Sequence, residues 1–251
     1  NAMVVTGDAE LDRAVDGAVV GSFANTGQLC ISIERIYVPD EVFDRFIGAF
    51  REATKRIKLG SGLNWNYQMG SLINQNQLDT VQRFVDDAVA KGARVINAGG
   101  GESHQTFFQP AVLSPVDSSM RVYHEEQFGP LVPVVPYRDL QEVIDYVTAS
   151  DYGQQLSIFG NDPAQVGRLV DAFVNQVGRI NINAQCQRGP DSYPFNGRKN
   201  SAEGTLSVHD ALRVFSIRTL VATRFNEANK ELVDRIIRDR QSSFLTTDYI
   251  F

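Results

Sequence analysis

Residues 140–183 read LQEVIDYVTASDYGQQLSIFGNDPAQVGRLVDAFVNQVGRININ and contain two successive units, each a helix pattern followed by a strand pattern. Apolar residues recur at helical spacing in the first part of each unit, and a short apolar run follows. The expected helices are 140–150 and 163–176, and the expected strands are 155–162 and 178–183. Pro163 suits the first turn of the second helix. This alternation is typical of βαβ units around a parallel sheet.

The same alternation extends toward the amino end of the chain. Asp8 is a candidate N-cap for a helix that ends near 25–27, and Asp40 is a candidate cap for a second helix. The further segments are a helix at 76–92 and strand-like runs at 34–39, 93–100, 107–116 and 131–139. The sequence therefore predicts an α/β fold with a mostly parallel open sheet flanked by helices.

Composition excludes several classes of function. The 251 residues carry a formal net charge of −6 with dispersed basic residues, which argues against a nucleic acid or an anionic membrane as partner. No apolar run approaches the roughly 18 residues of a membrane span. Two cysteines and no secretory leader pattern favour a reducing cytoplasm. With three histidines and no Cys/His pair at ligand spacing, we expect no metal site.

Two regions near the carboxyl end differ from the rest. Residues 185–204 have no periodicity and form a long loop, a feature that is usually functional inside a compact domain. A helix and an end strand are expected at 206–223, and a charged amphipathic helix follows. We expect a catalytic domain over 1–224 and a helix with a tail over 225–251 that contacts another subunit.

Cys30 is placed between a Gly/Asn-rich turn and a strand-like run. A thiol acts as a nucleophile only as thiolate, which requires access and nearby donors or positive charge. The turn before Cys30 could supply backbone N–H donors, but a free cysteine is also a common small apolar core residue. Position alone leaves both interpretations open.

Three motifs resemble those of the aldehyde dehydrogenase superfamily. FANTGQLC at 23–30 resembles the segment that carries the nucleophilic cysteine, and EEQFGPLVPV at 125–134 resembles the Glu-x-Phe-Gly-Pro signature. PFNGRKNS at 194–201 resembles the loop on the substrate side. The resemblance covers essentially the whole chain. It implies that Cys30 attacks an aldehyde and forms a thioester, with NADP or NAD as cofactor.

The resemblance also implies roles for the residues of the second motif. In the family the glutamate binds the nicotinamide ribose and the phenylalanine packs against the ring, which assigns these roles to Glu126 and Phe128. Each has a simpler alternative. Glu126 next to Glu125 is also compatible with a solvated acidic pair, and Phe128 with an ordinary core residue.

The segment QRGPDSYPFNG at 187–197 resembles the non-phosphorylating, NADP-dependent glyceraldehyde-3-phosphate dehydrogenases of this superfamily. That resemblance implies that Arg188 binds the substrate phosphate and that Phe195 lies on the substrate side. Pairing of Arg188 with Asp191 is the alternative. Some of those enzymes carry Arg before the nucleophile, where this chain has Leu29. Another aldehyde, such as a semialdehyde or an aliphatic one, therefore stays open.

The resemblance further implies what lies outside this chain. The family's water-activating glutamate, its oxyanion-binding asparagine and nearly all of its dinucleotide-binding domain have no counterpart here, so we expect the chain to be the C-terminal catalytic half of a larger enzyme. An inactive module with a structural or assembly role and a cofactor-free thiol acyltransferase are the alternatives. Family members are homo-oligomers, and we expect the same here.

Overall fold

The computed structural model describes residues 1–63, 66–217 and 219–245. It divides into two compact units, Asn1–Asp210 and Ala211–Phe251, which are described separately. Within these described ranges, no helix is long and apolar enough to cross a membrane.

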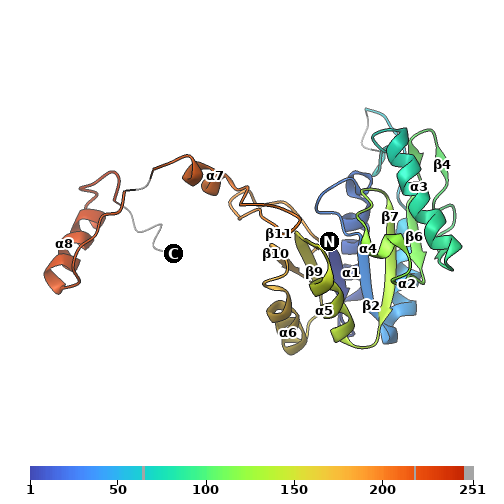
Figure 1. The fold of residues 1–251 in the computed structure, drawn as a ribbon, viewed down its shortest axis with the longest axis horizontal. Helices are drawn as coiled ribbons and strands as arrows, with labels where there is room; N and C mark the ends of the chain where they lie inside the picture. Colours follow the sequence, from blue (N-terminus) through green and yellow to red (C-terminus); the bar gives the residue numbers. More distant parts are fainter. Residues whose placement is uncertain (64–65, 218, 246–251) are drawn as a thin grey trace. The chain divides into compact units, whose positions relative to one another are not determined.

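The first unit is built on a seven-stranded sheet in the order β10-β9-β1-β2-β7-β6-β3 (Figure 1). All neighbouring strands are parallel except β3, which runs antiparallel to β6. The strands are β1 Ala2–Val5, β2 Arg35–Pro39, β3 Arg94–Val95, β6 Ala111–Ser114, β7 Leu131–Tyr137, β9 Gln155–Phe159 and β10 Arg179–Ile182. The predicted α/β fold with a mostly parallel sheet is therefore confirmed.

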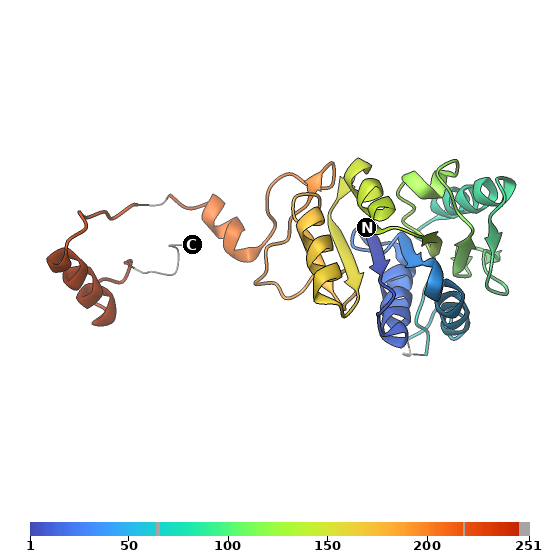
Figure 2. The ribbon, with the colours of Figure 1, turned by 90° about the horizontal axis from the view of Figure 1, so that it is seen from below.

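Helices cover both faces of this sheet, with α1 and α2 on one face and α5 and α6 on the other. Figure 2 shows α1 and α2 on the side opposite α5. Side chains alternate between the faces along each strand. In β1, Met3 and Val5 pack with α1 and α2, whereas Ala2 and Val4 pack with α5 and α6. The helices of the first unit are α1 Leu11–Phe23, α2 Asp40–Thr54, α3 Gln75–Ala90, α4 Arg121–His124, α5 Leu140–Ala149 and α6 Pro163–Phe173. Helix α7 (Val208–Val214) spans the boundary between the units, and α8 (Glu227–Arg238) belongs to the second unit.

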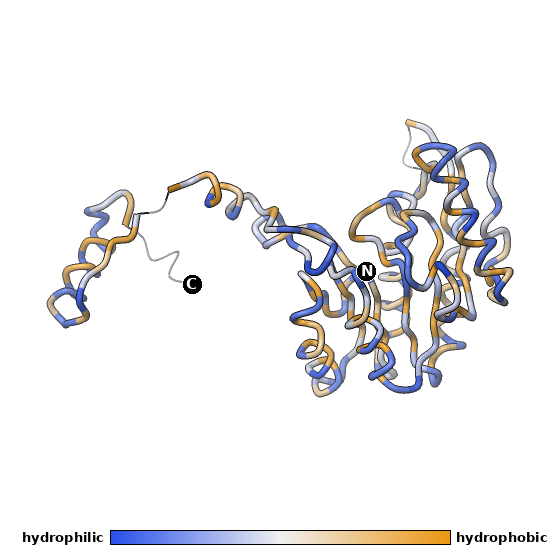
Figure 3. The backbone as a smooth tube through the Cα atoms, viewed as in Figure 1, coloured by the Kyte–Doolittle hydropathy of each residue, from blue (hydrophilic) through white to orange (hydrophobic). Residues whose placement is uncertain are grey.

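The apolar core follows from this two-sided packing. Phe46 and Phe50 of α2 are fully buried on one face, and Phe173 of α6 is fully buried on the other. Figure 3 shows apolar residues along the strands and polar residues on the loops of the first unit. Strands covered on both faces read as nearly continuous apolar runs, which is why the sequence pattern identified them.

Two of the predicted helix caps are wrong. The side chain of Asp8 accepts from Thr6 Oγ1 and Asn161 N, and α1 begins later with Glu10 at its N-cap position. Asp40 lies inside the first turn of α2 and pairs with Arg138, with 2.9 Å between Oδ2 and Nε. Both carboxylates thus bind other elements in place of their own helix ends.

The long loop contains one short strand that the sequence did not predict. β11 (Arg198–Lys199) pairs antiparallel with β8 (Tyr152–Gly153). A second two-stranded ribbon joins β4 (Ser103–His104) to β5 (Phe107–Phe108). These strands are too short to carry a periodic signal.

The second unit contains α8, whose first turn is capped by Asn226 through a bond to Asn229 N of 2.8 Å. The described residues of 215–224 form no strand, so the expected end strand is wrong for that part of the segment. Apolar side chains of this unit are exposed, including Phe215, Phe225 and Phe244. The last aromatic residues of the expected tail, at 246–251, lie outside the described residues.

Candidate active site

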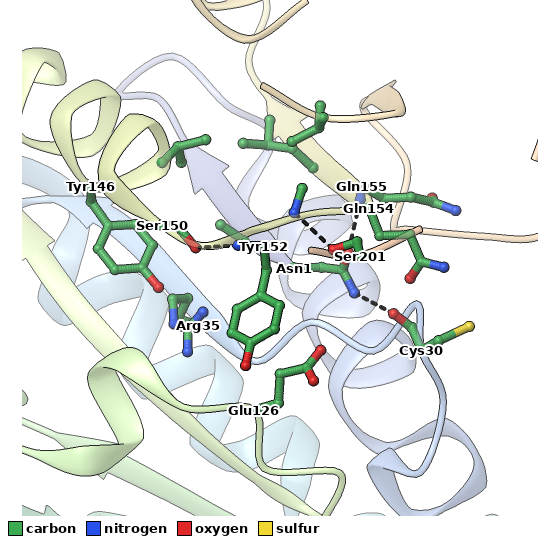
Figure 4. Close-up of a pocket in the computed structure, with 15 residues that line it drawn as sticks. Asn1, Cys30, Arg35, Glu126, Tyr146, Ser150, Tyr152, Gln154, Gln155 and Ser201 are labelled. Atoms are coloured by element: carbon green, nitrogen blue, oxygen red, sulfur yellow. Dashed lines mark hydrogen bonds between the residues drawn. The ribbon is translucent and has the colours of Figure 1, made fainter. Parts of the chain in front are cut away.

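The sequence-predicted nucleophile lies at the amino-terminal edge of the sheet. Cys30 occupies the turn that precedes β2, and Glu126 lies in the loop that precedes β7. Because β1, β2, β7 and β9 are parallel, their amino ends meet at this edge. Cys30 and Glu126 line one pocket there, a cavity of about 30 Å³ whose wall also includes Tyr152 and Ser201 (Figure 4).

The turn before Cys30 has an unusual backbone. Asn25, Thr26 and Gly27 all have left-handed conformations, with φ of 50°, 61° and 66°. A Cβ atom on Gly27 would lie 2.2 Å from the carbonyl oxygen of Gly129, so only glycine fits there. The turn that carries Cys30 therefore packs directly against the Gly-Pro end of the second motif.

Cys30 itself is exposed. The side chain of Asn1 holds its turn in place, because Nδ2 donates to Cys30 O at 2.8 Å and to Ser32 O at 2.9 Å. The Oδ1 atom of Asn1 accepts from the backbone N–H of Gln155 at 2.8 Å, which links the turn to β9. In Figure 4 the carbonyl of Cys30 faces Asn1, whereas its sulfur points away from Glu126.

The two acidic residues of the second motif lie in different environments. Glu125 accepts from Arg121 Nε and Nη2, both at 2.8 Å, and this hydrogen bonding lowers the pKa of Glu125. The carboxyl group of Glu126 lines the pocket, where partial burial and then the charge of Glu34 raise its pKa. Because the two pKa values shift in opposite directions, Glu125 and Glu126 lie in different environments and do not form a solvated acidic pair.

Phe128 has a strained backbone and an exposed ring. Its φ of 45° is left-handed, a conformation that is uncommon for a bulky residue, and it is 36% exposed. Nε2 of Gln77 in α3 donates to the carbonyl oxygens of Gln127 and Phe128, at 2.9 and 2.8 Å. Arg35 Nη2 donates to Glu125 O at 3.2 Å. Side chains from other elements thus fix the backbone of this loop.

Arg188 and Phe195 lie together in the long loop. The guanidinium carbon of Arg188 is 4.5 Å from the ring centre of Phe195, and Nη1 is 3.8 Å from Oδ1 of Asp191. Arg179 of β10 anchors this loop by donating to Gln187 O at 3.1 Å and to Gly189 O at 2.9 Å. The ion pair with Asp191 is the alternative interaction that the sequence left open.

Four of the five predicted site residues thus form two pairs. Cys30 and Glu126 line the pocket in Figure 4, and Arg188 and Phe195 contact each other but are not among its lining residues. Phe128 follows Glu126 in the loop and is not a lining residue either. No set of three His, Cys, Asp or Glu residues in the described part of the chain is arranged to hold a metal ion.

The other cysteine has a different environment. Cys186 is buried in the core, burial raises its pKa, and its sulfur lies 3.3 Å from Ser157 Oγ. Burial disfavours the thiolate, so this thiol is a poor nucleophile. The two cysteines thus differ in access, because Cys30 is exposed and Cys186 is buried.

Lys199 of the PFNGRKNS motif lies beside the pocket, and the sequence analysis assigned it no role. Nζ of Lys199 donates to the carbonyl oxygens of Val147, Thr148 and Ser150 at 2.7, 3.1 and 2.8 Å. It thereby caps the C-terminal end of α5, next to the pocket-lining Ser150 and Ser201. Burial lowers the pKa of Lys199. A single lysine in an irregular loop has no signal that identifies this contact beforehand.

Comparisons with known proteins identify the family of this chain. Residues 1–221 match the aldehyde dehydrogenase family. The chain is 34% identical over 227 residues to a putative succinate-semialdehyde dehydrogenase [NADP(+)] 2 of Mycobacterium ulcerans, covering 87% of this chain and 44% of that protein. It is also 34% identical to 3-sulfolactaldehyde dehydrogenase of Pseudomonas putida, covering 80% of this chain and 41% of that protein.

The fold resembles solved structures of the same family. One is an NADP-dependent glyceraldehyde-3-phosphate dehydrogenase from Bacillus halodurans complexed with NADP, with a TM-score of 0.80, 32% identity, and coverage of 84% of this chain and 44% of that one. Another is succinate-semialdehyde dehydrogenase from Burkholderia pseudomallei, with a TM-score of 0.80, 30% identity and the same coverage. The chain spans less than half the length of these relatives. The sequence motifs and the family match over 1–221 together show that this chain belongs to the aldehyde dehydrogenase family.

Proposed function

We propose that the protein containing this chain oxidises an aldehyde to a carboxylic acid with a nicotinamide cofactor, with Cys30 as nucleophile. The observation that carries this proposal is that Cys30, an exposed residue, and Glu126 line one pocket. Aldehyde oxidation requires a nucleophile and a cofactor side by side, and these two residues supply one group for each.

The chemistry assigned to Cys30 begins with its thiolate. The sulfur adds to the aldehyde carbon and forms a hemithioacetal whose oxygen carries the negative charge. The backbone N–H of Cys30 has no hydrogen-bond partner among the described residues, so it is available to donate to that oxygen. Oxidation of the hemithioacetal leaves a thioester on Cys30, and hydrolysis of the thioester releases the acid and restores the thiol.

Glu126 and Phe128 fit a nicotinamide nucleotide. When bound, NADP or NAD supplies the two-electron acceptor for the oxidation. The Glu126 carboxylate at the pocket is suited to accept hydrogen bonds from ribose hydroxyls, and the exposed ring of Phe128 offers an apolar surface for a planar ring. Relatives named as NADP-dependent support NADP as the first cofactor to test.

The substrate is proposed to be an aldehyde with an anionic end, and glyceraldehyde 3-phosphate in particular. The names of the relatives point to succinate semialdehyde, 3-sulfolactaldehyde and glyceraldehyde 3-phosphate, which carry a carboxylate, a sulfonate and a phosphate. Arg188 supports an anionic substrate, because a guanidinium offers planar paired donors to such groups. Phe195 packs against Arg188 and supports its position.

The activity is proposed for the whole protein, because the chain spans less than half of its relatives. We propose that the water-activating glutamate and most of the cofactor-binding surface are supplied by sequence outside this chain, and that the protein is a homo-oligomer. Residues 1–224 would then be the catalytic part and residues 225–251 the contact with another subunit.

The test is nicotinamide reduction followed at 340 nm with the full-length protein, using glyceraldehyde 3-phosphate, succinate semialdehyde and unphosphorylated glyceraldehyde with NADP or NAD. Turnover that requires Cys30 and favours the anionic aldehydes supports the proposal. Turnover that persists in Cys30→Ser contradicts the assigned nucleophile. A protein that cleaves activated esters at Cys30 but never reduces the cofactor is a thiol acyltransferase, and the oxidoreductase proposal then fails.

A further inference from the structure

Glu34 is a buried carboxylate that belongs to neither of the motifs around it. It lies directly before β2, the strand that follows Cys30, and is 6% exposed. Its Oε1 atom accepts from the backbone N–H of Gln127 at 2.8 Å and from that of Phe128 at 3.2 Å. Its other carboxylate oxygen lies 3.9 Å from the backbone nitrogen of Asn1. A buried carboxylate is retained only where such donors compensate for its lost hydration.

Glu34 is one of three side chains that fix the backbone of the loop that carries Glu126. Glu34 binds the N–H groups of Gln127 and Phe128, while Gln77 binds the carbonyl oxygens of the same two residues. Arg35, the next residue after Glu34, binds the carbonyl oxygen of Glu125. Three side chains from two separate segments thus hold the loop from both sides.

The loop needs this support because its backbone is strained. Phe128 adopts a left-handed φ of 45°, and such conformations persist only where surrounding contacts fix them. A charged acceptor that receives the N–H of the strained residue and the N–H before it provides such a contact. Glu34 also connects the loop to the backbone of the Cys30 segment, four residues from the thiol.

We infer that Glu34 is a positioning residue for the proposed reaction: its buried carboxylate fixes the Glu126–Phe128 loop relative to Cys30, so that the ribose- and ring-binding groups lie beside the nucleophile. This inference deepens the proposed function and rests on it. Glu34 is not among the residues that line the pocket and acts through the backbone of the loop.

The experiment compares Glu34→Ala and Glu34→Gln in the full-length protein with the control Glu52→Ala, which removes an exposed carboxylate on α2. Three quantities are measured: hydrogen exchange of the Gln127 and Phe128 amides, the Kd for NADP, and the rate at which p-nitrophenyl acetate acylates Cys30. Acylation needs the thiolate and no cofactor. The thiolate attacks the acetyl carbon, and p-nitrophenolate leaves.

In Glu34→Ala we expect faster exchange at both amides, a Kd for NADP that is roughly ten- to hundredfold higher, and an unchanged acylation rate, because a charge-assisted pair of hydrogen bonds is lost while the thiol remains. Glu34→Gln keeps an acceptor oxygen without the charge and should recover part of both effects. The control should match the wild type in all three.

Two outcomes overturn the inference. Unchanged exchange at both amides in Glu34→Ala means that Glu34 does not fix the loop. Loss of cofactor binding and thiol acylation in parallel means a general structural role. If the wild type binds no nicotinamide nucleotide, the proposed function fails separately, and the exchange of the two amides alone decides whether Glu34 fixes the loop.

Discussion

Arg188 and Asp191 face each other across an exposed turn of the long loop, with 3.8 Å between Nη1 and Oδ1. Both side chains are more than half exposed, at 51% and 78%, and exposed ion pairs contribute only about 0–1 kcal/mol to stability. Arg188 can therefore leave Asp191 and bind a substrate anion with little loss of free energy. The observed ion pair and the proposed anion binding are compatible.

The first prediction concerns substrate choice. Arg188→Ala should raise the KM for glyceraldehyde 3-phosphate roughly ten- to hundredfold, because a charge-assisted contact is worth about 1.5–3 kcal/mol. The KM for unphosphorylated glyceraldehyde should stay nearly unchanged. Arg188→Lys should recover only part of the loss, since an ammonium lacks the planar fork. Steady-state kinetics of the full-length variants measure both constants.

Asp191→Asn is the matched control, because it removes the competing carboxylate and keeps the size of the side chain. It should leave the KM for glyceraldehyde 3-phosphate unchanged or lower it. If Arg188→Ala impairs both aldehydes equally, Arg188 orders the loop through Asp191 and Phe195 and does not recognise the anion.

The second prediction concerns the two thiols. Iodoacetamide should alkylate Cys30 and spare Cys186, because Cys30 is exposed while Cys186 is buried with a raised pKa. Peptide mass spectrometry after brief labelling of the native protein measures this. Denatured protein, in which both cysteines should react, is the control. Labelling of Cys186 at the rate of Cys30 in native protein would contradict the structure.

The third prediction concerns pH. The pKa of Glu126 is raised, first by burial and then by Glu34, so its carboxyl group takes up a proton at a higher pH than an ordinary glutamate. A protonated carboxyl group is a weaker acceptor for ribose hydroxyls. The Kd for NADP should therefore rise as the pH falls through this raised pKa, and it should level off above it.

Glu126→Gln should remove this pH dependence and weaken NADP binding at neutral pH, because the uncharged amide accepts less strongly. Titration of NADP binding between mildly acidic and neutral pH compares the two proteins. The same pH dependence in Glu126→Gln would assign the titration to another group.

The sequence predicted the sheet and its helices because strands buried on both faces and amphipathic helices leave clear periodic patterns. It did not predict the partners of Asp8 and Asp40, which look like helix caps but bind Asn161 and Arg138, residues distant in sequence. Such contacts depend on which strands become neighbours, and local patterns contain no information about that.

For the site, the motif resemblance identified Cys30 and Glu126, and the structure brings them to one pocket. The sequence did not assign a role to Glu34, which binds the loop of Glu126, or to Lys199, which caps α5 beside the pocket. Glu34 resembles any charged residue beside a strand, and the motif that contains Lys199 does not indicate its contact with α5. Both side chains bind backbone groups of segments that are distant in sequence, and only the folded structure shows these contacts.

The fourth prediction concerns Lys199. Lys199→Met should lower the free energy of unfolding by about 1 kcal/mol, because the last carbonyl groups of α5 lose an ammonium donor at the negative end of the helix dipole. Chemical denaturation of the full-length protein measures the change. Lys58→Met, at an exposed lysine, is the control and should have little effect. Equal stability of both variants would contradict a capping role.

The last prediction concerns association. The unit Ala211–Phe251 exposes Phe215, Phe225 and Phe244, with exposed fractions of 90% or more. Apolar side chains with exposed fractions this large favour contact with a partner surface. Deleting residues 226–251 should therefore shift the full-length protein toward smaller assemblies or lower its solubility, as measured by light scattering on a sizing column. A tail that folds back onto its own subunit is the alternative, and it predicts one monodisperse monomer before and after deletion. Leu232→Ser in α8 removes one exposed apolar side chain and keeps the chain length. It should also shift the protein toward smaller assemblies if the tail contacts another subunit, and it should leave a monomer unchanged if the tail folds back.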